Sequence, residues 1–213
     1  VAGRQQRHTK LKEANAAGLT NVELLKRADQ ARATANELMQ LERWEDALFA
    51  YSEAIDHWDS IENLPVRQRK EVDEQIRVAY NNVFAANLAS AHFRGALEAA
   101  RQLTTRFPQH PIGWYTLAMG LNNYFASGKA HGRDDGDRRK MAAECDTAIE
   151  TATALLQEFR AASLGDGWPA KADLLESLTW LRKEHGRREQ PDTPAVAAAC
   201  WALAEFNKPI SEG

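Results

Sequence analysis

Residues 111–124 have the sequence PIGWYTLAMGLNNY. Pro111 suits the first position of a helix, because the N–H that proline lacks has no helical partner there. The small Ala118 between larger apolar neighbours allows a second helix to approach closely. The stretch therefore predicts one helix of a helical hairpin. Its apolar face, at spacings of three and four residues, consists of Trp114, Leu117, Ala118 and Leu121.

Helical patterns and helix-ending signals continue along the rest of the chain. Thr20 and Glu23 form a capping box, Gly95 marks a turn, and Asp137 is placed to cap a helix after a glycine-rich loop at 127–137. Short loops make neighbouring helices antiparallel, and runs of β-branched residues that would indicate a sheet are nearly absent. We expect helices at about 20–41, 45–64, 66–92, 96–107, 111–124, 138–162, 169–185 and 194–206.

These helices are arranged in repeats that start at about 28, 77 and 111. The third repeat follows the second directly, whereas about 15 residues are inserted between the first two. The pattern resembles the 34-residue tetratricopeptide repeat (TPR). The matching residues are Ala35, Leu38, Ala47, Tyr51 and Ala54 in the first repeat, Tyr80, Val83, Ala96 and Pro108 in the second, and Trp114, Leu117, Ala118 and Leu121 in the third.

The resemblance implies an all-α fold of antiparallel helical hairpins, stacked as a short right-handed TPR-like superhelix with C-terminal capping helices. The last two helices are either a degenerate fourth repeat or a cap. We expect a flexible N-terminal tail at 1–19, TPR-like repeats over 20–164 (28–61, 77–110 and 111–162, the last with the loop at 127–137 inserted), and a C-terminal hairpin or cap at 165–213.

The repeat spacing also resembles the TPR domains of immunophilin-type co-chaperones, which hold chaperone carboxylates in a clamp of cations and amides. That resemblance places Arg32, Asn36 and Asn82 at three clamp positions. Two positions that are cationic in the family hold Ile112 and Thr116, so the usual chaperone tail is not expected as a ligand. Further groove-facing positions by the same numbering are Asp29, Met39, Gln40, Tyr115, Met119, Asn122 and Asn123.

Asn, Tyr and Met side chains favour a neutral, partly apolar peptide or helix as the ligand. The chain is therefore predicted to be a protein-interaction scaffold that binds a peptide or helix in its concave groove. The alternative is a structural subunit of a larger assembly, whose own C-terminal helices fill the groove. The predicted binding residues are Arg32, Asn36, Asn82, Tyr115, Met119 and Asn123.

Composition narrows the classes of partner. A net charge of −3 removes the usual argument for nucleic-acid binding. No apolar run approaches the roughly 20 residues that span a bilayer, and the N-terminus lacks a signal sequence, so a cytoplasmic protein without a membrane partner is expected. Cys145 and Cys200 are interpreted as buried reduced thiols; a disulfide between them is unsupported. The oligomeric state stays open.

Motifs that would indicate an enzyme are missing. Gly128-Lys129-Ala130 lacks the spacing of a phosphate-binding loop. Asp134, Asp135 and Asp137 lack the spacing of a calcium-binding loop, and Glu144 is interpreted as part of a solvated helix face. We therefore expect no catalytic residue, no metal site and no cofactor.

Overall fold

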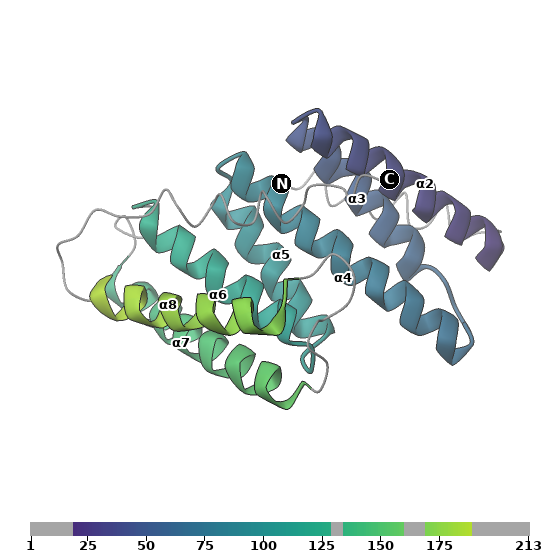
Figure 1. Ribbon diagram of the computed structural model, residues 1–213. Coiled ribbons are helices and arrows are strands. Elements are labelled where there is room, and N and C mark those ends of the chain that lie inside the picture. Colours follow the sequence, from purple (N-terminus) through teal and green to yellow (C-terminus); the bar gives the residue numbers. More distant parts are fainter. Residues whose placement is uncertain (1–18, 129–133, 160–168, 189–213) are drawn as a thin grey trace. The chain divides into compact units, whose positions relative to one another are not determined.

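The computed structural model describes residues 19–128, 134–159 and 169–188. Within these ranges the chain forms seven α-helices and no β-strand (Figure 1), which confirms the all-α prediction. The predicted helix at 194–206 and Cys200 lie outside the described residues. The helices are α2 (Asn21–Gln40), α3 (Trp44–Asp59), α4 (Val66–Ala89), α5 (Phe93–Arg106), α6 (Pro111–Ala126), α7 (Asp135–Glu158) and α8 (Lys171–Arg188).

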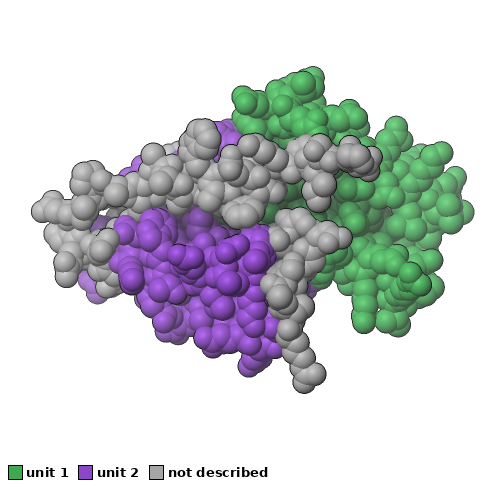
Figure 2. Space-filling view, in the orientation of Figure 1, with its two compact units in different colours: residues 1–86 green, residues 87–213 purple. Residues whose placement is uncertain are grey.

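The chain divides into two compact units (Figure 2). Unit 1 is residues 1–86 and unit 2 is residues 87–213. Helices α2 and α3 pack together in unit 1, which also holds most of α4. In unit 2, α6 packs against α5, α7 and α8. The boundary falls inside α4, so the last residues of that helix belong to unit 2.

The turns that end α2 and α4 have the same backbone conformation. Glu42 and Ala91 each have φ 56°, in the left-handed region that commonly ends a helix. The following N–H groups bond back to the helix, Arg43 N to Leu38 O at 2.9 Å and His92 N to Asn87 O at 2.7 Å. Glu42 and Ala91 lie 49 positions apart, which equals the predicted spacing of the first two repeats. Turns with the same φ and the same back-bond therefore recur at that spacing, while the bounds of the repeats stay a prediction.

Gly95 does not form the turn that the sequence predicted. It lies inside α5, where an added Cβ would overlap Asn87 Oδ1 and lie 2.8 Å from Asn87 Cγ. Asn87 is buried. This glycine is therefore needed for close packing between the end of α4 and the start of α5, and the left-handed turn is made by Ala91 instead.

Two predicted helix ends are also wrong. Asp134, and not Asp137, caps α7, because its Oδ1 accepts the Asp137 backbone N–H at 2.8 Å. The predicted loop at 127–137 is therefore already helical from Asp135. Gly186 does not end α8, which continues to Arg188. A single glycine inside a helix costs only about 1 kcal/mol, so one more turn is tolerated there.

Small residues form the contact between the helices of each hairpin. Ala28 and Ala35 of α2 and Ala47 and Ala54 of α3 are fully buried. In unit 2 the buried Cys145 of α7 takes this place, with its Sγ 3.9 Å from the Ala118 carbonyl of α6. Cys145 is thus buried, as the sequence predicted. Close approach of the backbones depends on these small side chains.

Candidate functional site

Three of the predicted binding residues come from two helices of unit 1. Arg32 and Asn36 lie one turn apart on α2, so they share a face of that helix. Asn82 lies on α4. All three side chains are half-buried, beside the buried alanines of the α2 stripe. The repeat numbering therefore selected positions at the edge of the core, where a polar side chain reaches both protein and solvent.

Tyr51 joins two of these residues. Its hydroxyl donates to Asn36 Oδ1 at 2.6 Å and accepts from Asn82 Nδ2 at 2.9 Å. The Tyr51 side chain comes from α3 and is 1% exposed, so its hydroxyl must find partners inside the protein. We call Arg32, Asn36, Tyr51 and Asn82 the Tyr51 cluster. Within it, one buried hydroxyl holds amides from α2 and α4.

The Tyr51 cluster also contains a cation that lacks a partner. The Nε of Arg32 is buried and makes no hydrogen bond within the described residues. Burial raises the pKa of Tyr51 to about 12, while the Asn82 hydrogen bond and then the positive charge of Arg32 oppose that rise. Tyr51 is consequently a neutral hydroxyl at physiological pH. The cluster therefore combines a positive charge with two oriented amides.

The sequence prediction assigned Tyr51 only a packing role. Its signal was the hydroxyl itself, because a phenylalanine fills the same apolar position without needing polar partners. Asn36 and Asn82, both predicted to face the groove, could have been considered as its hydrogen-bond partners. Only the packing of α2, α3 and α4 brings these two side chains within hydrogen-bond distance of Tyr51.

The other three predicted binding residues lie on α6 in unit 2 and are buried: Tyr115, Met119 and Asn123 are 6%, 4% and 2% exposed. Burial raises the pKa of Tyr115, and a side-chain hydrogen bond with Ser177 of α8 opposes that rise. Helix α8 packs against α6, so Tyr115 faces another helix of its own unit. Any ligand of these three residues must displace part of the protein, and their binding role stays a prediction.

The remaining groove-facing positions differ in exposure. Asp29 and Gln40 are exposed, Met39 is half-buried and Asn122 is buried. The exposed pair lies on α2 together with Arg32 and Asn36. A ligand of the Tyr51 cluster could therefore extend along α2 without any rearrangement of the core.

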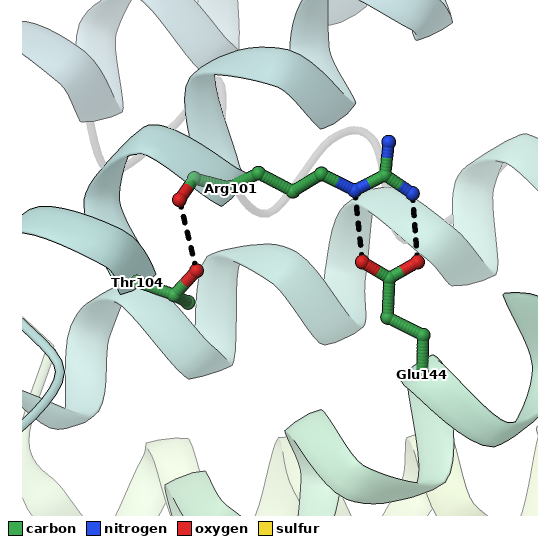
Figure 3. Close-up of polar contacts among 3 residues, drawn as sticks. All are labelled: Arg101, Thr104 and Glu144. Carbon is green, nitrogen blue, oxygen red and sulfur yellow. Dashed lines mark hydrogen bonds and ion pairs between the residues drawn. The ribbon is translucent and has the colours of Figure 1, made fainter.

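The sequence assigned Glu144 to a solvated helix face, and in the structure this half-buried side chain also forms an ion pair. It accepts two hydrogen bonds from Arg101, from Nε at 2.8 Å and from Nη2 at 2.7 Å (Figure 3). On the Arg101 side, Thr104 Oγ1 donates to the Arg101 carbonyl at 3.0 Å. The hydrogen bond with Glu144 raises the pKa of Arg101 and outweighs its partial burial. The pair connects α5 with α7, and the two charges neutralise each other within the protein.

Metal binding and membrane insertion are two further functions that a structure can indicate. Within 19–128, 134–159 and 169–188, no group of three or more His, Cys, Asp or Glu side chains is placed to hold a metal ion. No helix in the described part of the chain is long and apolar enough to cross a membrane.

Known proteins resemble this chain in structure and not in sequence. No family model matches it. No curated protein matches it either. Among solved structures it is similar to the C-terminal TPR-containing domain of a Plasmodium falciparum protein described as a putative FK506-binding protein, with a TM-score of 0.54 and 15% identity. That similarity covers 82% of this chain and 99% of the other. The chain therefore has the all-α fold of TPR-like helical repeats.

Proposed function

We propose that this protein is an interaction module that binds a peptide or a helix of a partner protein through the Tyr51 cluster. The proposal rests on a half-buried Arg32, whose Nε has no hydrogen-bond partner in the described part of the chain, beside two amides oriented by Tyr51. Buried polar groups are normally satisfied, so an unsatisfied Nε in a residue that is itself only half-buried favours a ligand. TPR-like folds serve many processes, so a function has to be inferred from the residues of the site and not from the fold.

The proposal includes several simpler expectations. The partner is a protein and not a nucleic acid, because the net charge is −3 and phosphate backbones require concentrated positive charge. The protein acts in the cytoplasm without catalysis, metal or cofactor. Helix α2 contributes most of the contact, since Asp29 and Gln40 extend the exposed surface on either side of Arg32 and Asn36.

A selection from a random peptide library tests this function. Wild type should enrich a defined set of peptides, and Arg32→Ala combined with Asn82→Ala should lose at least about tenfold in affinity for them, the size of one or two charge-assisted hydrogen bonds. The matched control is Arg27→Ala combined with Gln30→Ala, which also removes one cation and one amide, both from exposed positions of α2. Equal binding by the cluster variant and the control variant would reject the Tyr51 cluster as the site.

A second candidate is a structural subunit of a larger assembly. The observation in its favour is that Tyr115, Met119 and Asn123 are buried, with α8 packed against α6. A subunit of this kind purifies from its source in a complex of fixed stoichiometry. Its incorporation should be unaffected by Arg32→Ala and Asn82→Ala, whereas an interaction module should lose its partner.

A further inference from the structure

The Tyr51 hydroxyl lies between two amides but has only one proton to donate. It gives that proton to Asn36 Oδ1 and accepts a hydrogen bond from Asn82 Nδ2. A single proton cannot serve two carbonyl oxygens. At least one amide must therefore contact Tyr51 through its nitrogen, which leaves the carbonyl oxygen of that amide for another partner.

Three polar groups of the cluster are left for a ligand. Asn36 keeps its NH₂ group as a donor, Asn82 keeps its carbonyl as an acceptor together with its second N–H, and Arg32 keeps its guanidinium. Within the described ranges no partner is found for these groups. The site thus offers donors on the α2 side and an acceptor on the α4 side.

This pattern disfavours a carboxylate that bridges the two amides. An ionised carboxylate has acceptors only, so it can accept from the donors of the site but leaves the Asn82 carbonyl without a proton. A carboxamide has one acceptor and at least one donor in fixed geometry. Its oxygen can face Asn36 and Arg32 while its N–H faces Asn82, so the Asn82 carbonyl then has a donor as well.

We propose that Tyr51 determines the specificity of this site by making it selective for an amide group over a carboxylate. The amide is either a peptide bond of an extended ligand or the side chain of Asn or Gln. Tyr51 acts as a positioning residue, because its hydroxyl sets the direction of both amides and is itself 1% exposed. The inference rests on the proposed function, since it assigns a ligand chemistry to the same cluster.

Small probes test the selectivity directly. The side-chain NH₂ signals of Asn36 and Asn82 are followed by NMR during titration with N-methylacetamide, propionamide or sodium propionate at constant ionic strength. The first two probes separate a peptide bond from a side-chain amide, and the third has the same size as propionamide with acceptors only. Wild type should bind one or both amides about threefold to tenfold more tightly than propionate, as expected for one satisfied hydrogen bond.

Tyr51→Phe should remove this preference while keeping the ring. Without the hydroxyl both amides are free to turn their NH₂ groups toward the ligand, so propionate should bind at least as well as propionamide. Asn36→Asp is the second variant: it keeps an acceptor for Tyr51 and replaces the outward donor with an acceptor. This variant should lose amide binding while remaining folded, as checked by its circular dichroism.

Two results would overturn the inference. One is equal or tighter binding of propionate to wild type, or no saturable shift with either amide probe. The other is an unchanged amide-to-propionate ratio in folded Tyr51→Phe. The proposed binding function has its own test: it is rejected if Arg32→Ala combined with Asn82→Ala weakens the binding of none of the selected peptides. Peptides that depend on the cluster but carry Asp or Glu at the contact would reject the selectivity and leave the binding function intact.

Discussion

Ionisation of Tyr51 should couple the stability of the protein to alkaline pH. Burial raises the pKa of Tyr51 to about 12 in the folded state, against an ordinary value of 10.0. A group with a raised folded pKa contributes stability that is complete below its unfolded pKa and is lost as the pH rises toward the folded pKa. Wild type should therefore lose stability relative to Tyr51→Phe between about pH 10 and pH 12.

The size of the effect follows from the two pKa values. A difference of about two units corresponds to about 2.7 kcal/mol when the titration is complete. At pH 11 the unfolded chain is mostly ionised at this residue and the folded chain is mostly neutral, so about half of that energy, roughly 1.4 kcal/mol, is already lost. Below pH 9 neither state ionises, and the stability difference between wild type and Tyr51→Phe should be constant at about 1–3 kcal/mol, the value of two hydrogen bonds.

Urea unfolding of both proteins from pH 8 to pH 11 measures this directly. Comparison of the two proteins cancels the lysines and the other tyrosines, which titrate in both. The expected result is a stability difference that shrinks by roughly 1.4 kcal/mol by pH 11. If the stability difference between the two proteins stays constant across this range, Tyr51 ionises with the same pKa in the folded and unfolded states. That result would contradict the burial of its hydroxyl in a hydrogen-bonded cluster.

Three further substitutions test other parts of the structure. Gly95→Ala should destabilise by about 1–3 kcal/mol in urea unfolding because its Cβ meets Asn87, although alanine favours helix; an equal loss in an Asn87→Ala background would contradict this cause. Glu144→Gln should cost about 0.2–1 kcal/mol at low salt and less at high salt, with the exposed Glu158→Gln as the neutral control. Thr20→Ala should raise part of the lowered pKa of Glu23, as followed by NMR titration, because it removes the hydroxyl hydrogen bond and keeps the backbone N–H that is the largest cause; an unchanged pKa would exclude the hydroxyl of Thr20 as a partner of Glu23.

Much of the fold could be predicted because its signals are local. The capping box at Thr20 and Pro111 at the start of α6 are properties of a few neighbouring residues, and both are found in the structure. The repeat phase depends on residues spread over a whole repeat, but each of them can still be read from its position along the chain. Two turns with the same φ, at Glu42 and Ala91, lie at the predicted spacing, and the bounds of the repeats stay a prediction. Helix ends were less well predicted, since Asp134 and Asp137 are both suitable caps and only geometry selects one.

The candidate site was only partly accessible from the sequence. The resemblance to clamp-type TPR domains selected Arg32, Asn36 and Asn82, but it treated them as separate side chains facing a ligand. Their linkage through Tyr51 depends on hydrogen bonds between three helices, across 15 and 31 positions of the chain. The same numbering placed Tyr115 beside a ligand, and this stays a prediction; the structure adds a hydrogen bond between Tyr115 and Ser177 of α8. The position of a residue in a repeat indicates which way its side chain points, but not which side chains of the same protein it contacts.

By itself, the sequence determined that this chain is helical and where most helices lie, because periodicity, capping and proline act within one or two helical turns. Only the tertiary structure decided which groups are partners. In the structure Gly95 allows close packing against Asn87, and Glu144 pairs with Arg101. Tyr51, which the sequence assigned to the core, also forms hydrogen bonds at the centre of a polar cluster. The physical reason is that a hydrogen bond depends on distances of about 3 Å between atoms of different helices, which no pattern along one helix specifies.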